Sequence, residues 1–518
     1  MEKNKQILIN MIAQIISFIV NVGISFFLTA FIVKNIGKEI FGFWGLANNF
    51  VSYIGVLTIA LNSTVNRFVT ISLHKKDYTS ANKYFSSVAL ANITLSAILI
   101  IPILLLVTFL DNMLVIPKEF VIDIKLLWLF IFINFLVNLG SGVLEVSTFA
   151  KNRLDMVATT TIISNTTRAL LLIILFNLLS PHLWYVGLAL LICTFYTASA
   201  RYRFFKRLTP KLMIKRKYFD WKFMKEMLLI GFWNSFNQLS IILITGLNLL
   251  ITNLLIGAKD MSLLSVAVTI PTQIQSFVQI VANTFSPKLT ATYAKGDLSV
   301  LAKEVIFSMK VTGYLGSIPI IGLMIFGGDF FPLWLNTVSS ADITKIQLLS
   351  ILTLIPLIGN TFVNPLFNIN TVLAKVKIPV LTNFLIGILN IVIVYVLIRY
   401  FNLGVYTVAG VSAILVLGRM LLFVPIYSAH ILKLSWLTFY KFLLKGFLSL
   451  TIVIFVLLSI KFVTDINSWG SLAIVCSIAG IVGYFINFLL IFNREERRTV
   501  INVLKRKFKN KNLTRRAE

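Results

Sequence analysis

The chain has 518 residues, of which 58% are hydrophobic and 13% charged, and its mean hydropathy is +0.90. A soluble domain carries more charge than this on its surface, so the composition excludes a soluble protein and a low-complexity chain. The formal net charge of +28 comes mainly from short loops and the C-terminal tail, a pattern typical of membrane topology and contact with anionic lipids. We therefore expect membrane lipids, and no nucleic acid, as partners.

The few cysteines and histidines predict neither a disulfide framework nor a metal site. Cys193 and Cys476 lie inside apolar stretches, and His74, His182 and His430 are scattered at the ends of such stretches. The sequence has no Gly-Lys-Ser or Gly-Lys-Thr phosphate loop, so ATP hydrolysis is not expected. We predict no cofactor, and coupling to protons or sodium ions stays open.

Apolar stretches in chain order predict fourteen membrane-spanning helices, because each is long enough to cross most of a hydrocarbon core of about 30 Å. They cover residues 7–33, 41–71, 84–109, 122–149, 156–179, 183–200, 227–256, 261–287, 305–327, 345–372, 378–398, 403–430, 442–463 and 469–492. An even number places both termini on one side of the membrane. That side also holds the loop 201–225, with ten lysines and arginines, and the basic tail. The positive-inside rule therefore predicts that both termini are cytoplasmic.

Two similar segments indicate an internal repeat. The sequence GKEIFGFWGLANNF after the first span parallels GAKDMSLLSVAVTI after the seventh, and KKD and KGD turns follow at nearly the same spacing. Asn62 matches Asn283 and Arg67 matches Lys288, each pair 221 residues apart. The expected fold is an all-α polytopic membrane protein with two six-helix lobes related by a pseudo-twofold axis, plus two C-terminal helices. The expected domains are an N-lobe at 1–215, a C-lobe at 216–432 and a C-terminal part at 433–518.

Amides recur along one face of several predicted spans. The candidates are Asn10, Gln14 and Asn21 in the first span, Asn62 in the second, Gln238 and Asn248 in the seventh, Gln273 and Asn283 in the eighth, and Asn360 and Asn364 in the tenth. An amide that faces lipid costs several kcal/mol, so we expect these faces to point inward. Two interpretations stay open: hydrogen bonding between packed helices, or a wet cavity whose uncharged amides suit sugar hydroxyls.

Charged side chains inside a span are rare and usually functional. Arg168 and Arg419 are predicted deep in the membrane, whereas Arg67 and Glu145 lie nearer the inner ends of their spans. A net positive cavity suits a phosphate or pyrophosphate, which the planar guanidinium of arginine can clamp. The arginines either pack helices or bind such an anion, and Glu145 either pairs with Arg67 or acts as a coupling carboxylate.

The first-loop sequence KNIGKEIFGFWGLANN, the sequence RFVTISLHKKD after the second span and the 6+6+2 arrangement resemble the Wzx-type polysaccharide flippases of the MATE-like multidrug/oligosaccharidyl-lipid/polysaccharide (MOP) exporter superfamily. The resemblance covers nearly the whole chain. It implies V-shaped lobes that work by alternating access in the bacterial cytoplasmic membrane. The implied substrate is a polyprenyl-pyrophosphate-linked oligosaccharide, a surface polysaccharide repeat unit, bound by Arg67, Arg168 and Arg419. Polysaccharide polymerase and glycosyltransferases are the implied protein partners.

Other functions of a similar fold stay open. One is a lipid II-type peptidoglycan precursor flippase, although the first span lacks the arginines that this function implies. Another is a cation-coupled multidrug antiporter, although no acid stands in the first span. An enzyme is not expected, because the largest outer connection, Gly328–Thr344, offers Asp329 and Asp342 but neither histidine nor arginine.

Overall fold

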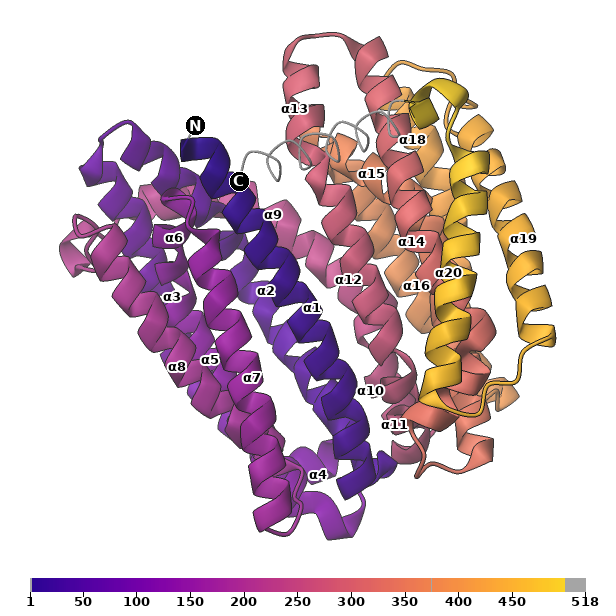
Figure 1. Cartoon of the computed structure of the whole chain (residues 1–518). Helices are drawn as coiled ribbons and strands as arrows, with labels where there is room; N and C mark the ends of the chain where they lie inside the picture. Colours follow the sequence, from indigo (N-terminus) through magenta and orange to yellow (C-terminus); the bar gives the residue numbers. More distant parts are fainter. Residues whose placement is uncertain (1, 374, 499–518) are drawn as a thin grey trace, which may run out of the picture. The chain divides into compact units, whose positions relative to one another are not determined.

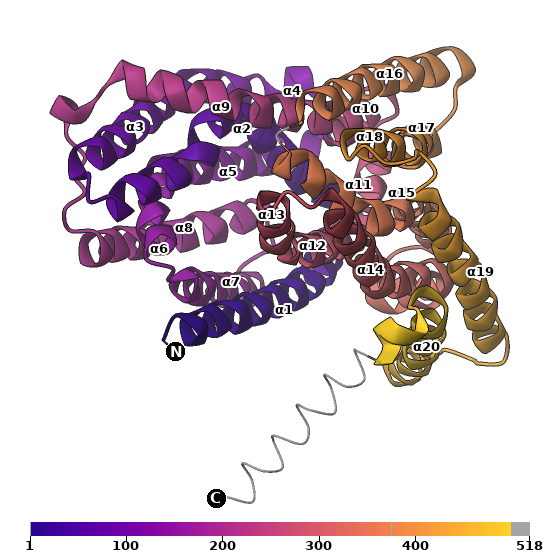
Figure 2. The same cartoon turned by 90° about the horizontal axis from the view of Figure 1, so that it is seen from above.

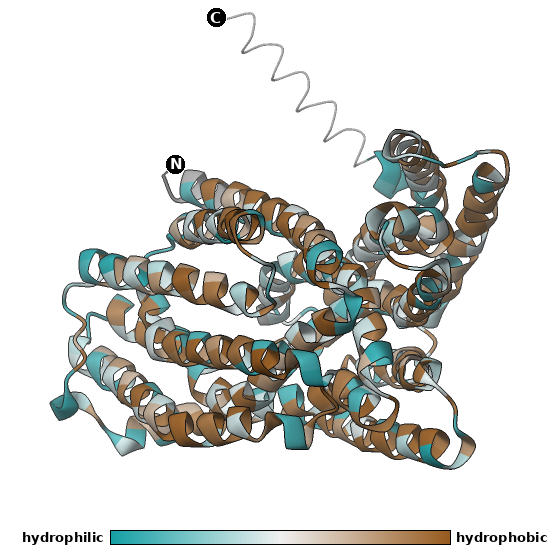
Figure 3. Ribbon diagram, turned by 90° about the horizontal axis from the view of Figure 1, so that it is seen from below, coloured by the Kyte–Doolittle hydropathy of each residue, from teal (hydrophilic) through white to brown (hydrophobic). Residues whose placement is uncertain are grey.

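The structure is a computed structural model that describes residues 2–373 and 375–498. Every regular element in these ranges is a helix (Figure 1), which confirms the predicted all-α fold. Hydrophilic residues gather in connections and at helix ends, and hydrophobic residues cover most of the helix surfaces (Figure 3). This distribution is expected of helices that meet lipid along their length.

The α-helices are α1 (Glu2–Ile36), α2 (Lys38–His74), α3 (Tyr78–Thr108), α4 (Leu110–Met113), α5 (Val121–Gly142), α6 (Val146–Ala150), α7 (Leu154–Leu178), α8 (Trp184–Leu208), α9 (Trp221–Ile241), α10 (Asn248–Leu255), α11 (Ala258–Ala267), α12 (Thr269–Thr284), α13 (Ser286–Ala294), α14 (Leu298–Trp334), α15 (Ser340–Val372), α16 (Lys377–Phe401), α17 (Val405–Gly418), α18 (Val424–Ile431), α19 (Tyr440–Phe462) and α20 (Trp469–Ile491). The 3-10 segments are η1 (Lys118–Phe120), η2 (Val143–Glu145) and η3 (Arg216–Tyr218). The π-helical segments are η4 (Ile242–Gly246) and η5 (Arg419–Phe423).

Thirteen helical stretches among the described residues are long and apolar enough to cross a membrane. The sequence predicts fourteen spans, and its sixth corresponds to α8, a continuous helix of 25 residues that is not one of the thirteen. The reason is charge, because the last two turns of α8 carry Arg201, Arg203, Lys206 and Arg207. The apolar part of α8 is therefore short.

The chain forms two compact units. Unit 1 comprises the described residues of Met1–Val266 and Val380–Val411, and unit 2 comprises those of Ala267–Pro379 and Ser412–Glu518. These units reflect contacts in space, and they do not follow the boundaries expected at residues 215 and 432, because α9 and α16 are grouped with helices of the first half. The division into an N-lobe, a C-lobe and a C-terminal part stays a prediction.

In unit 1, α2 packs against α1, α3, α5 and α9. A row of helices runs from α5 through α8 and α7 to α1, and each helix in it packs against the next (Figure 2). Gly231 of α9 permits the closest approach to α2, because a Cβ at this position would overlap the carbonyl oxygen of Ala60. A buried cluster that includes Val65, Phe85 and Met227 fills the space between α2, α3 and α9.

In unit 2, α14 is central and packs against α12, α15, α19 and α20. Phe362 of α15 is fully buried, and its ring lies against Gly313 of α14 and Gly446 of α19, where no side chain competes for the space. The last two helices, α19 and α20, pack on each other and on α14. The two C-terminal spans are thus part of the core of unit 2.

The internal repeat recurs in the geometry of short turns. Lys76 and Gly296, which are 220 residues apart, both adopt the left-handed backbone conformation, with φ of 61° and 80°. The next residue in each case, Asp77 or Asp297, accepts a hydrogen bond from a backbone N–H in the first turn of the following helix. The KKD and KGD sequences therefore form the same capped turn.

Equivalent residues of the repeat also touch each other inside unit 1. The backbone N–H of Gly42 in α2 donates to Ser262 Oγ in α11 (3.2 Å), and that hydroxyl donates to the carbonyl of Glu39 (2.6 Å). Gly42 and Ser262 are 220 residues apart, and so are Gly45 and Ser265, which pack together one turn further on. Contact between equivalent residues is what a twofold axis produces.

Candidate functional site

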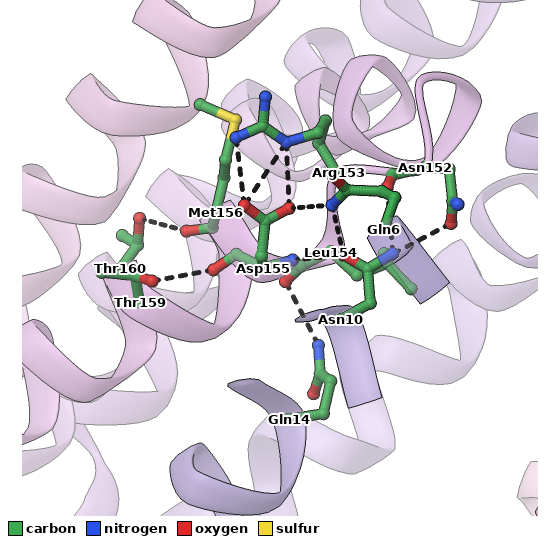
Figure 4. Close-up of polar contacts among 10 residues, drawn as sticks. All are labelled: Gln6, Asn10, Gln14, Asn152, Arg153, Leu154, Asp155, Met156, Thr159 and Thr160. Carbon is green, nitrogen blue, oxygen red and sulfur yellow. Dashed lines mark hydrogen bonds and ion pairs between the residues drawn. The ribbon is translucent and has the colours of Figure 1, made fainter. Parts of the chain in front are cut away.

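Asn10, predicted on the polar stripe of the first span, commits its whole amide to neighbouring groups (Figure 4). Its Nδ2 donates to the carbonyl (2.9 Å) and the Oδ1 (3.0 Å) of Asn152. Its Oδ1 accepts from the backbone N–H of Asp155 (3.0 Å) and from Gln6 Nε2 (3.0 Å), and Arg153 pairs with Asp155 beside it. With every donor and acceptor used, Asn10 fixes α1 to the start of α7 and has no group left for a ligand.

Gln14 and Asn21 continue the same face of α1 toward α7. Gln14 is exposed and its Nε2 lies 3.4 Å from the carbonyl oxygen of Leu154 (Figure 4). Asn165 of α7 donates through its Nδ2 to Asn21 Oδ1 (3.2 Å). The stripe in the first span is therefore mainly an interface between two helices, which favours the helix-packing interpretation at these positions.

Asn62 and Arg67 lie on α2 in different surroundings. Asn62 Oδ1 accepts a hydrogen bond from Nδ2 of Asn92 in α3 (2.9 Å), a partner that the sequence analysis did not single out. Arg67 is exposed, on the same face as the exposed Ser63. None of the ion pairs among the described residues involves Arg67, so its charge is available to a ligand.

Glu145 forms an ion pair with Arg201 of α8, whose Nε lies 2.7 Å from Glu145 Oε1. Arg201 Nη1 also donates to Asn138 Oδ1 (2.8 Å) and Ser141 Oγ (3.2 Å). The expectation that Glu145 pairs with Arg67 is therefore wrong. The physical reason is that α8 runs past residue 201, so an arginine that the sequence places in a loop lies inside the helix, beside the 3-10 turn η2 that contains Glu145.

Arg168 lies near the middle of α7, about 21 Å along the helix from Leu154 and about 15 Å from Leu178 by helix rise. Its Nε is buried without a hydrogen-bond partner, and none of the ion pairs among the described residues reaches it. A guanidinium at this depth is costly unless an anion or water satisfies it.

Arg419 is the first residue of the π-helical segment η5 and lies near the middle of the stretch Val405–Ile431. Its guanidinium carbon is 5.0 Å from the centre of the Phe367 ring in α15, a cation–π contact within unit 2. Pro425, at the start of α18, lacks the N–H that would continue a regular helix through this region. The π-helical turn and the proline together set the position of Arg419.

Amides of α12 and α15 meet inside unit 2. Asn364 Nδ2 donates to Gln279 Oε1 (3.2 Å), and Asn368 Nδ2 donates to the carbonyl oxygen of Ala282 (3.0 Å). Asn360 is buried on the same helix as Asn364. On α12 the predicted Gln273 is half-buried and Asn283 is exposed, and other exposed polar side chains share the helix: Thr272, Gln275, Ser276, Gln279 and Thr284. Exposed polar groups in a stretch that crosses a membrane indicate a surface that meets water or a polar ligand.

The seventh span contains polar groups that the sequence analysis missed. The π-helical segment η4 frees backbone carbonyls, and Asn390 of α16, which is fully buried, donates to the carbonyl of Ile244 (3.0 Å). Asn49 Nδ2 (2.9 Å) and the Tyr53 hydroxyl (2.6 Å), both from α2, donate to the carbonyl of Gly246. A glycine inside an apolar span was the available signal for this irregular turn. The predicted Gln238 and Asn248 flank η4, and both are half-buried.

The structure thus divides the predicted site residues between the two units. Arg67, Arg168, Glu145 and most of the predicted amides belong to unit 1, whereas Arg419, Gln273, Asn283, Asn360 and Asn364 belong to unit 2. Within the described ranges, no group of three or more histidine, cysteine, aspartate or glutamate side chains could hold a metal ion.

The sequence matches a family model described as polysaccharide biosynthesis protein over residues 4–292, which is more than half of the chain. The chain belongs to this family. The chain is also 29% identical over 493 residues to the uncharacterized membrane protein EpsK of Bacillus subtilis (strain 168), a match that covers 95% of this chain and 97% of EpsK.

Among the solved structures that share the fold of this chain are a flippase and a multidrug transporter. The lipid II flippase MurJ in an inward closed conformation has a TM-score of 0.64 and 16% identity, and the match covers 93% of this chain and 98% of MurJ. An inward-facing multidrug resistance MATE family transporter of the MOP superfamily has a TM-score of 0.62 and 12% identity, with 82% and 98% covered. Identities this low show the fold alone. The family match thus places the chain among polysaccharide biosynthesis proteins, and the solved structures confirm the predicted MATE-like fold.

Proposed function

We propose that this protein is a flippase that moves a polyprenyl-pyrophosphate-linked oligosaccharide from the cytoplasmic to the outer leaflet by alternating access. The physical need for such a protein is clear, because each sugar hydroxyl moved into hydrocarbon without a partner costs about 2–7 kcal/mol. A few sugars therefore make spontaneous crossing negligibly slow. Family membership supports a role in polysaccharide biosynthesis, and the fold supports a transporter.

The observation that carries the proposal is Arg168. It lies in mid-span with a buried Nε that has no hydrogen-bond partner, and none of the ion pairs among the described residues neutralises it. A pyrophosphate would supply charge and hydrogen-bond acceptors to a planar guanidinium at this depth. In the proposal, Arg168 binds the pyrophosphate in mid-span and the exposed Arg67 binds it nearer the cytoplasmic side, both within unit 1, and Arg419 is the candidate anion-binding residue of unit 2.

The exposed amides of unit 2 are proposed to bind the sugars of the substrate. Gln279 and Asn283 of α12 are exposed and uncharged. Their amides can therefore donate hydrogen bonds to sugar hydroxyls and accept hydrogen bonds from them, whether the sugar is neutral or charged. Asn10, Gln14 and Asn21 are left out of this surface, because their contacts run to the segment 152–165. The proposed sugar-binding surface therefore relies on α12 more than on α1.

Orientation and location are also part of the proposal. Both termini are proposed to be cytoplasmic, because the loop 201–225 and the basic tail concentrate the positive charge on that side. The membrane is proposed to be the bacterial cytoplasmic membrane, where polyprenyl-linked sugars are assembled, and polysaccharide polymerase and glycosyltransferases are proposed as protein partners. The pair Glu145–Arg201 supports a structural role for Glu145, so the proposal assigns no coupling ion.

A genetic experiment tests this function. The gene is deleted in its host and restored as wild type, Arg168→Ala or Arg399→Ala, and the leaflet in which the lipid-linked glycan accumulates is measured with a membrane-impermeant glycan-modifying enzyme. Arg399 is an exposed arginine at the end of α16 and serves as the matched control. We expect the glycan to be stranded in the cytoplasmic leaflet after deletion and with Arg168→Ala, but not with Arg399→Ala. Normal delivery to the outer leaflet in the deletion strain would refute the proposed function.

A further inference from the structure

The segment that joins the two halves of the sequence, residues 201–225, is an ordered surface with an unusual composition. We call it the basic segment. It leaves the end of α8, passes through the 3-10 turn η3 and enters α9. Nine of its ten cationic side chains are exposed, and they are Arg203, Lys206, Arg207, Lys211, Lys215, Arg216, Lys217, Lys222 and Lys225. The tenth, Arg201, pairs with Glu145.

Side chains of α3 hold the backbone of the basic segment in place. Asn82 donates to the carbonyl of Lys211 (3.1 Å) and accepts from the N–H of Met213 (2.7 Å). The Ser86 hydroxyl donates to the carbonyl of Met213 (2.6 Å), and Asn82 and Ser86 are both buried. Buried polar groups that bind a loop backbone make the loop a fixed part of unit 1, because separating them leaves unsatisfied donors and acceptors.

The acidic side chains in and beside the basic segment are already engaged. Asp220 pairs with Lys83 of α3 (2.9 Å), and this hydrogen-bonded lysine keeps the pKa of Asp220 below its ordinary value. Glu226, one residue beyond the segment, accepts a hydrogen bond from the Tyr84 hydroxyl (2.7 Å). No free carboxylate is therefore left within the segment to neutralise its exposed cations.

Exposed apolar side chains lie among these cations. Met213, Ile214, Phe219 and Trp221 have relative exposures of 40%, 40%, 44% and 59%. A loop that met only water would gain nothing from four exposed apolar groups within nine residues. Cations mixed with an indole and aliphatic side chains are typical of protein surfaces that bind the head-group region of a bilayer.

We propose that the basic segment is a docking surface for anionic phospholipid head groups of the adjacent leaflet. The lysines and arginines would bind lipid phosphates, and Met213, Ile214, Phe219 and Trp221 would enter the head-group layer. Charge complementarity selects this occupant, because a polybasic surface beside a membrane is drawn to anionic lipid. Topology alone does not account for it, since the matching stretch of the second half, residues 422–446, carries three cations, Lys433, Lys441 and Lys445, against ten in the basic segment. The proposal does not depend on which substrate is transported.

The test uses full-length protein reconstituted in bilayers. Ile214→Cys in a background of Cys193→Ala and Cys476→Ala is labelled with an environment-sensitive fluorophore. Bilayers contain phosphatidylcholine alone or mixed with phosphatidylglycerol, each with and without a lipid-attached quencher. We expect a blue-shifted emission and quenching in the phosphatidylglycerol mixture, both reduced at high salt because the attraction is electrostatic. Emission typical of water in both bilayers would overturn the proposal.

Charge variants separate a specific surface from general positive charge. Lys211, Lys215, Arg216 and Lys217 are changed together to glutamine, which leaves the contacts to Asn82 and Ser86 intact, since these involve the backbone. The matched control changes four exposed lysines elsewhere, Lys75, Lys151, Lys303 and Lys441, to glutamine. We expect the first variant to lose the blue shift and the control to keep it. An equal loss of the blue shift in both variants would contradict docking on lipid. A blue shift that appears only after a soluble acidic protein is added would contradict it as well.

Discussion

A polar side chain in a membrane span stabilises the fold only when its hydrogen-bonding groups are matched, and the contacts of Asn10 and Arg168 show the two extremes. Asn10 uses all four of its hydrogen-bonding positions on Asn152, Asp155 and Gln6. Arg168 keeps a buried Nε with no hydrogen-bond partner. By this reasoning Asn10 stabilises the fold, whereas Arg168 carries a buried hydrogen-bond donor without a partner, which a bound ligand could satisfy.

Replacing Asn10 by alanine removes four hydrogen bonds and leaves the backbone N–H of Asp155 and the carbonyl of Asn152 without that partner. We expect the change to lower the free energy of unfolding by about 1–3 kcal/mol. Thermal unfolding in detergent measures the effect. Gln14→Ala is the matched control on the same helix, because Gln14 is exposed with one long contact, and its expected effect is within about 0.5 kcal/mol. Equal destabilisation by the two changes would contradict this account of Asn10.

The helix cap at Asp77 predicts a pH dependence at the start of α3. Hydrogen bonds from the hydroxyl and the backbone N–H of Ser80 keep the pKa of Asp77 below its ordinary value. Because the folded-state pKa is the lower one, the cap stabilises the helix above the unfolded-state pKa of about 3.9 and is lost as the pH falls through the folded-state pKa. Amide exchange protection of the first turn of α3 is therefore expected to fall in acid. In Asp77→Asn, which caps without titrating, protection should stay level, and a parallel fall would rule the cap out as the cause.

At the scale of helices, hydropathy and length in the sequence were sufficient to predict all thirteen helical stretches that, among residues 2–373 and 375–498, are long and apolar enough to cross a membrane. The irregular parts were not predictable in the same way. The π-helical turn η4 has tertiary partners, Asn390 and Tyr53, that are far away in sequence. The end of α8 lies beyond Arg201 because the pair with Glu145 holds this arginine beside α5 and η2. Local charge alone favours a loop there, which is why the partner of Glu145 was predicted wrongly.

Close packing of α2 and α9 depends on a glycine. A Cβ at position 231 would overlap the carbonyl oxygen of Ala60, so Gly231→Ala must push α9 away from α2. We expect a loss of about 1–3 kcal/mol in the free energy of unfolding, as for other overpacked sites. Gly140→Ala in α5 is the control, since nothing lies within 4 Å of its added Cβ, and the better helix propensity of alanine favours it by up to about 1 kcal/mol. Calorimetry of the purified proteins distinguishes the two, and a stable Gly231→Ala would show that α2 and α9 are less closely packed.

For the whole molecule, the all-α fold with two lobes followed from composition, span number and the repeat, and its MATE-like character from the family resemblance. The repeat reappears in the turns at Asp77 and Asp297. The site was less accessible to prediction. Spacing identified the helix faces that carry amides, but it could not tell Asn10, whose amide is fully hydrogen-bonded, from Asn283, which is exposed. The division of chain segments into compact units also depends on contacts distant in sequence, such as Ser240 with the carbonyl of Val380.

The proposed orientation predicts which loops face outward. In a background of Cys193→Ala and Cys476→Ala, we expect Asp465→Cys, between α19 and α20, to react with a membrane-impermeant maleimide in intact cells. We expect Lys75→Cys, between α2 and α3, to react only after the cells are permeabilised. Both positions are exposed, so access to the reagent depends on the side of the membrane. The reverse pattern would place both termini outside.

The most direct measurement of the central claim is lipid flipping by the purified protein in liposomes. A fluorescent polyprenyl-pyrophosphate-linked oligosaccharide is placed in both leaflets, and an impermeant quencher reports the fraction that reaches the outer leaflet with time. The account predicts near-complete quenching with wild type and Arg399→Ala. It predicts a rate lower by about ten- to a hundredfold with Arg168→Ala, the loss expected when one charge-assisted contact is removed. Quenching that stops at the outer-leaflet fraction with wild-type protein, as in protein-free liposomes, would contradict the claim that this protein is a flippase.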